Sequence, residues 1–106
     1  MAISVNYSNA RAQATKLEQA ANRCDGVISK LNQSLSIVSS NWSGAAADEY
    51  YMNIQKQIKE VKQIRDNCRS IAKVIREVVW QLEEAERRAK AAAEAARIAA
   101  EQASKG

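Results

Sequence analysis

The chain carries two long stretches of helical periodicity, separated by a single short break at Trp42-Ser43-Gly44. On each side of the break, apolar or small residues follow one another at steps of three and four, which keeps them on one stripe of an α-helix. The first stripe is Ala10, Ala14, Leu17, Ala21, Cys24, Ile28, Leu31, Leu35 and Val38; the second is Ala47, Tyr51, Ile54, Ile58, Val61, Ile64, Cys68, Ile71, Ile75, Val78 and Leu82. Two such helices with a tight connection predict an all-α fold, an antiparallel helical hairpin.

The length of 106 residues allows one domain, and the lack of proline agrees with long uninterrupted helices. We expect a hairpin over residues 1–85, with a first helix at about 8–39, a turn at 40–44 and a second helix from about 45. Residues 1–7 are expected to form a short extended lead-in.

The helix ends are predicted from polar residues that can cap them. Ser8 or Asn9 is the expected cap of the first helix, and Ser43 that of the second. Gly44 is expected to let the chain turn tightly, through either a close approach or a positive φ.

The apolar stripe is broader than two helices need. At five places a residue of the stripe has a second large apolar or aromatic residue next to it in the sequence, which widens the stripe. The five pairs are Val27 and Ile28, Ile37 and Val38, Tyr50 and Tyr51, Val74 and Ile75, and Val78 and Val79. A stripe of this width is typical of a helix inside a four-helix bundle, so we expect two hairpins to pack together, as a homodimer or with a similar chain. The predicted seam and partner interface consists of Leu17, Ile28, Leu31, Leu35, Val38, Tyr51, Ile54, Ile58, Val61, Ile71, Ile75, Val78 and Leu82.

Residues 86–106 are rich in alanine and charge, and they extend beyond the point where the first helix can reach. We expect a helical extension that overhangs the hairpin and frays unless a partner covers it.

The two cysteines, Cys24 and Cys68, both fall on the stripe. A turn near residues 42–43 would offset them by about seven residues, or roughly 10 Å along the helices, which disfavours a disulfide between them. They are interpreted as small buried apolar residues.

Chemistry-bearing motifs are scarce. There is no histidine, and we find no glycine-rich phosphate loop and no cluster of metal ligands, so we expect neither an enzyme nor a cofactor. The net charge is +4, but Asp66 interrupts the basic row, and this argues against nucleic acid as a partner. The row consists of Lys59, Lys62, Arg69, Lys73 and Arg76. No segment resembles a membrane span or a Sec-type signal peptide, which favours a cytoplasmic protein without stable membrane insertion.

The motif Asn41-Trp42-Ser43-Gly44-Ala45 and its place at the centre of a proline-free chain of this length resemble the Trp-x-Gly family, the early-secreted-antigen-like proteins of type VII secretion. The resemblance covers nearly the whole chain. It implies a four-helix homodimer or heterodimer, export without a cleaved signal, and a role as effector, targeting factor or partner chaperone of a larger toxin. Possible partners are then a similar hairpin, that toxin and the secretion ATPase.

The family's export signal pairs the Trp-x-Gly turn with a Tyr-x-x-x-acidic motif after the second helix. This sequence departs from that pattern, since no tyrosine follows Tyr51. The nearest equivalent is Trp80-x-x-x-Glu84, which makes Trp80 and Glu84 the candidate export signal. The alternative is a cytoplasmic helical adaptor or a basic nucleic-acid-binding protein that is not exported.

Overall fold

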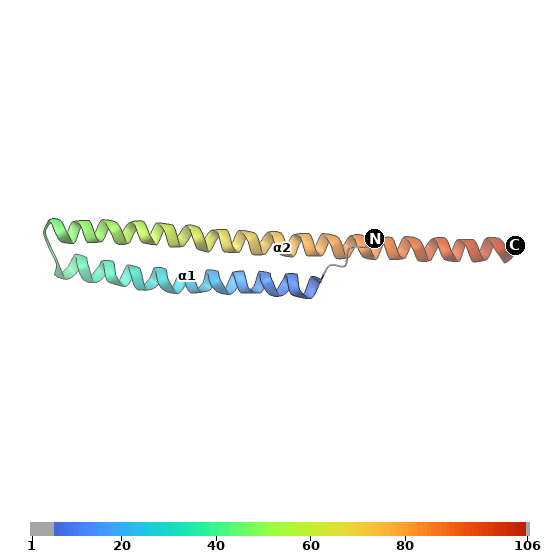
Figure 1. The fold of residues 1–106 in the computed structure, drawn as a ribbon, viewed down its shortest axis with the longest axis horizontal. Helices are drawn as coiled ribbons and strands as arrows, with labels where there is room; N and C mark the ends of the chain where they lie inside the picture. The colour runs from blue at the N-terminus through green and yellow to red at the C-terminus, as the bar shows by residue number, and fades with distance from the viewer. Residues whose placement is uncertain (1–5, 106) are drawn as a thin grey trace.

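The computed structural model describes residues 6–105 and shows two helices side by side, α1 (Tyr7–Asn41) and α2 (Ala45–Lys105). They run antiparallel and form a hairpin measuring 93 × 18 × 17 Å (Figure 1). The predicted all-α hairpin is confirmed.

Helix α1 starts earlier than the sequence suggested. The side chain of Asn6 accepts a hydrogen bond from the Asn9 backbone N–H at 2.9 Å and is the N-cap, so the expected caps Ser8 and Asn9 lie inside the first turn. Both asparagine and serine can cap a helix, and their identity alone could not decide between neighbouring positions. Residues 1–5 of the expected lead-in lie outside the described part of the chain.

Helix α1 also ends later than expected. The side chains of Ser39, Ser40 and Asn41 donate hydrogen bonds back to carbonyls of the preceding turn, at 2.8 to 3.1 Å. These bonds go to carbonyls that the helix already presents, so they are compatible with helix that continues past the expected end at about residue 39.

The turn depends on the conformation of Gly44, whose φ is +100°. A Cβ built on this glycine would meet no atom within 4 Å, so the requirement is the positive φ and not a close approach. Gly44 is also the residue directly before α2, and its carbonyl accepts a bond from the Asp48 N–H at 3.0 Å. Ser43 therefore does not occupy the predicted N-cap position.

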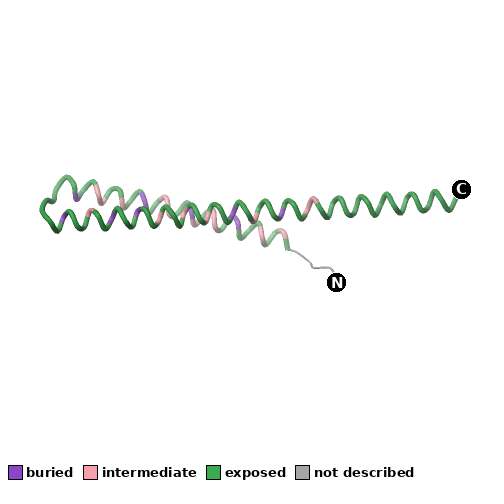
Figure 2. Tube along the Cα trace, turned by 90° about the horizontal axis from the view of Figure 1, so that it is seen from above, coloured by how far each residue is buried: buried purple, intermediate pink, exposed green. Residues whose placement is uncertain are grey.

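The core is thin and lies between the two helices. Ile28, Ile54 and Ile58 form its buried centre, with Leu31, Leu35 and Val61 packed against them. Toward the open end of the hairpin the buried residues become smaller, with Ala14 and Ala21 on α1 and Ala72 on α2. Figure 2 shows the buried positions only where the two helices overlap.

The predicted stripe of α2 is wrong in part beyond Val61. The buried and partly buried positions continue at regular steps of four and three, through Arg65, Cys68, Ala72, Ile75 and Val79. The sequence-based stripe took two consecutive steps of three to reach Ile64, which placed Ile71, Val78 and Leu82 against α1. These three residues are 50%, 46% and 40% exposed.

Among residues 6–105, the last part of α2 extends past the start of α1. Tyr7, at the start of α1, donates a hydrogen bond from its hydroxyl to Glu86 Oε1 at 2.5 Å, which marks the end of the overlap. Residues 85–105 are all exposed and helical through Lys105 (Figure 2).

Candidate functional site

One flank of the helix–helix seam is closed by ion pairs. Arg11 pairs with Glu83, Glu18 with Arg76 at 2.5 Å, and Asp25 with Arg69 at 2.5 Å. From one ion pair to the next, the residue number on α1 rises by seven and the residue number on α2 falls by seven. Because seven residues are nearly two helical turns, all three pairs lie in one row along the same side of the seam.

The central pairs shift the titration of their carboxyl groups. Hydrogen bonds from Arg65 and Arg69 hold the pKa of Asp25 below its ordinary value of 3.8. The hydrogen bonds from Arg76 lower the pKa of Glu18 below 4.5 in the same way. Both carboxylates are therefore charged and paired at neutral pH.

These ion pairs were not predicted from the sequence. The basic row through Arg69 and Arg76 was considered only as a surface for a polyanion. The signal was nevertheless present, because charges that complement Arg69, Arg76 and Glu83 recur at the same spacing of seven in Asp25, Glu18 and Arg11. Asp25 pairs with Arg69, and Glu18 pairs with Arg76. The basic row therefore has less unpaired positive charge available to a polyanion than its sequence suggests.

The other flank of the seam is apolar and open. At 100° per residue, Ile64, Ile71 and Val78 lie on the side of the α2 seam opposite to Arg69 and Arg76. All three are 46–55% exposed. Val27 contributes the matching position on α1, and Val74 and Ile37 continue the surface outward, both more than half exposed. We call these six residues the apolar flank.

Of the predicted interface residues, ten are buried or partly buried within the hairpin: Leu17, Ile28, Leu31, Leu35, Val38, Tyr51, Ile54, Ile58, Val61 and Ile75. Ile71 and Val78 lie on the apolar flank. Leu82 lies near the open end. The predicted set thus divides into an internal seam and an external surface.

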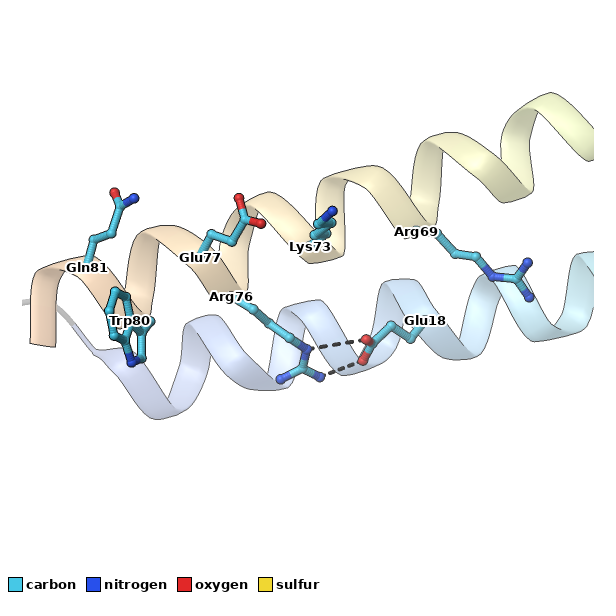
Figure 3. A pocket seen from close by; sticks show the side chains of 7 residues that line it. All are labelled: Glu18, Arg69, Lys73, Arg76, Glu77, Trp80 and Gln81. Atoms are coloured by element: carbon cyan, nitrogen blue, oxygen red, sulfur yellow. Dashed lines mark hydrogen bonds and ion pairs between the residues drawn. The ribbon is translucent and has the colours of Figure 1, made fainter. Parts of the chain in front are cut away.

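Trp80, the first residue of the candidate export signal, is 61% exposed and borders a groove on the ion-paired flank. The groove has a volume of about 490 Å³, and Arg76 and Lys73 also line it. Figure 3 shows Glu18 reaching from α1 to Arg76, with Trp80 one turn further along α2. Trp80 thus presents an aromatic face beside cationic side chains, on the side of the hairpin away from the apolar flank.

Glu84, the second residue of the candidate signal, follows Trp80 by one turn of the same helix. Its carboxylate pairs with Arg87 at 2.7 Å. Trp80 is exposed, whereas the Glu84 side chain is only 26% exposed and is partly covered.

At the opposite end of the hairpin, Trp42 is 58% exposed. Its ring lies against Tyr50, with centroids 5.8 Å apart and planes tilted by 46°. Such tilted pairs are a favoured arrangement of aromatic rings. Trp42 and Tyr50 form an aromatic surface beside the turn, on the same end as Gly44.

Residues 6–105 contain no group of three potential metal ligands among His, Cys, Asp and Glu side chains. Within the same residues, neither helix has a stretch apolar and long enough to cross a bilayer.

Comparison with protein families gives one match. Residues 2–87 match the WXG100 family model, described as proteins of 100 residues with WXG. The match covers the hairpin, the Trp42-Ser43-Gly44 turn and the candidate signal. No curated protein and no solved structure matches the chain.

Proposed function

The chain belongs to the WXG100 family, and from that premise we propose that it leaves the cell through a type VII secretion system as a dimer of hairpins, and serves as partner chaperone or targeting factor for a larger secreted toxin. Family membership implies a small protein associated with type VII secretion. The dimer, the export of this chain and its role toward a toxin are the proposed part.

The observation that carries the proposal is the apolar flank. A hairpin of two helices cannot cover it, and within residues 6–105 no large side chain is fully buried. Exposed apolar surface of this kind is typical of an interaction site. A second hairpin packed on Ile64, Ile71 and Val78 would complete a four-helix bundle.

The difference between the two flanks favours packing of the second hairpin on the apolar flank. The ion-paired flank has its charges satisfied within the hairpin by Asp25–Arg69 and Glu18–Arg76. A partner on that side would have to desolvate or break these pairs, whereas a partner on the apolar flank removes hydrocarbon from water.

The proposed role is non-enzymatic and uses helical surfaces. In a bundle formed on the apolar flank, Trp80 would remain accessible, since it borders the groove on the ion-paired flank, and Glu84 follows it by one turn. They are the proposed export signal of this chain. The overhang, residues 86–105, offers a further helix on which a toxin can pack.

The test is immunodetection of the chain in culture medium of source cells with and without the type VII ATPase, alongside a lysis marker. We expect extracellular protein only when the ATPase is present. Trp80→Ala and Glu84→Ala should each reduce the secreted fraction strongly. Gln81→Ala, which alters a neighbouring residue of the same groove, is the matched control and should be exported normally.

Equal retention of the chain in both strains would contradict autonomous export. It would favour the alternative of a cytoplasmic adaptor or a nucleic-acid-binding protein. The two are separated by co-purification of a partner protein and by salt-dependent binding to DNA.

A further inference from the structure

We propose that α1 docks an acidic helix of another protein on its outer face, the side of α1 that is turned away from α2. This face is formed by Lys16, Gln19, Arg23, Gly26 and Lys30, all of which are exposed. No other element of residues 6–105 lies on it (Figure 1). The inference does not depend on the secretion role, because it rests on the charges and the surface of α1 alone.

The three cations of the outer face, Lys16, Arg23 and Lys30, form a nearly straight row. They follow one another at steps of seven residues, which is nearly two helical turns and about 10.5 Å along the axis. Within residues 6–105, none of them takes part in an ion pair. Arg69 and Arg76 on the ion-paired flank are both paired, so the row on α1 differs from them in being available to a partner.

The acidic residues of α1 do not neutralise this row. They are Glu18 and Asp25, and both pair across the seam with arginines of α2. The positions three and four residues away from each cation hold alanine, glutamine, glycine, valine or serine. Carboxylates at these positions could have formed pairs along the helix, and their absence leaves the three positive charges to the solvent.

Gly26 lies between Arg23 and Lys30 on the same face and has no role in the hairpin itself. Glycine weakens a helix interior relative to alanine. The positive φ found at Gly44 does not occur at Gly26, and a Cβ built there would meet no atom within 4 Å. A glycine at this position lets another backbone approach α1 closely, which suits a second helix lying along the row.

The spacing of the row indicates what this second helix carries. A helix that runs along α1 presents carboxylates at the matching interval when they are seven residues apart. No three acidic residues of this chain follow one another at steps of seven, so a second copy does not provide the complement. The occupant is therefore a helix of another protein, with three such carboxylates and a small residue over Gly26. Because it lies opposite to the seam, it leaves Ile64 and Ile71 of α2 free for a second hairpin.

The test measures binding of the full-length chain to two labelled helical peptides by fluorescence anisotropy, at low and at physiological salt. One peptide, the row peptide, has three glutamates at steps of seven on one face and alanine between them. The other has the same composition, with the glutamates distributed around the helix. We expect the row peptide to bind more tightly, and its affinity to fall as salt screens the pairs.

Lys16→Gln, Arg23→Gln and Lys30→Gln, made together, should weaken binding of the row peptide roughly tenfold, the combined effect of three exposed ion pairs. The matched control removes three positive charges from exposed positions of α2 and should bind the row peptide nearly as tightly as the unaltered chain. Its substitutions are Lys56→Gln, Lys59→Gln and Lys62→Gln.

Gly26→Leu should also weaken binding of the row peptide, because the leucine side chain fills the place where the second helix approaches. Leucine forms helix better than glycine, so circular dichroism should show the helices intact and the melting temperature should not fall. Unchanged binding by this variant would contradict a helix packed over Gly26.

Equal binding of the two peptides, no binding of either, or an equal loss in the α2 control would overturn the proposal. Each of these results would show that the arrangement of the three cations does not select a partner. Tighter binding of duplex DNA than of the row peptide, lost in the triple α1 variant, would assign the row to a polyanion instead. A lower mass of that variant in sedimentation equilibrium would assign it to a second copy of the chain.

Discussion

At the scale of single residues, the two glycines described in the structure have opposite roles. Gly44 has a φ of +100°, a conformation that other residues adopt only with strain. Gly26 lies inside α1 and is exposed, and a Cβ there would meet no atom within 4 Å. The same substitution should therefore have opposite effects at the two positions.

Gly44→Ala should lower the free energy of unfolding by about 1–2 kcal/mol, because alanine is strained at positive φ. Gly26→Ala should raise it by about 1 kcal/mol, since alanine is the better helix former. Urea denaturation followed by circular dichroism measures both. An unchanged midpoint for Gly44→Ala would show that the turn adopts another backbone conformation in solution.

The sequence predicted the importance of Gly44 but left two reasons open, close approach and positive φ. Only coordinates distinguish them, because both requirements select glycine. Asn6 shows the same limit at the start of α1. Several consecutive residues there can cap a helix, and the choice depends on where the backbone leaves the helical conformation.

At the scale of the elements, the register between α1 and α2 is the feature that sequence reasoning located least well. Val74 stands beside Ile75, and Val78 beside Val79, so apolar character alone does not tell which column faces α1. The buried positions of α2 follow one another at alternating steps of four and three residues, and this spacing places Arg65 at the seam. Its guanidinium reaches Asp25, and this charged residue was not considered for a core position.

The ion-paired flank makes the hairpin sensitive to acid. The pKa values of Asp25 and Glu18 are lowered in the folded state, so their contribution to stability is present above their ordinary values of 3.8 and 4.5. It is lost as the pH falls through the lower folded-state values. We expect the urea midpoint to be level from pH 7 to about 5 and to fall below that.

The double variant Asp25→Asn and Glu18→Gln should have a lower midpoint at pH 7 and a weaker fall in acid. Urea titrations at several pH values give this comparison. Glu49→Gln, close to the turn, is the control and should keep the acid dependence of the unaltered chain. A double variant with the full acid dependence would contradict the assignment to these two carboxylates.

At the scale of the whole molecule, the structure separates two kinds of surface that the sequence presented as one broad stripe. The inner seam holds the hairpin together, and the apolar flank lies outside it. A broad apolar surface could be predicted because pairs of adjacent apolar residues are visible in the sequence. Which residue of each pair faces outward depends on the register between α1 and α2.

Ile71→Glu and Val78→Glu, made together, should convert a dimer into a monomer, because they place two carboxylates in the proposed interface. Sedimentation equilibrium measures the mass, and circular dichroism checks that the helices remain. Met52→Glu changes an apolar residue that is 68% exposed and lies off this flank, and it should leave the mass unchanged. A monomeric unaltered chain, or a dimer that persists in the double variant, would contradict the proposed interface.

The narrow cross-section of the hairpin has a consequence for transport. A compact globule of this chain length would measure about 35 Å across. The single hairpin is 18 × 17 Å in cross-section, and all of its excess length lies along one axis. Moving end-on, each hairpin of the proposed dimer therefore presents a smaller cross-section than such a globule, with its hydrogen-bonded helices intact.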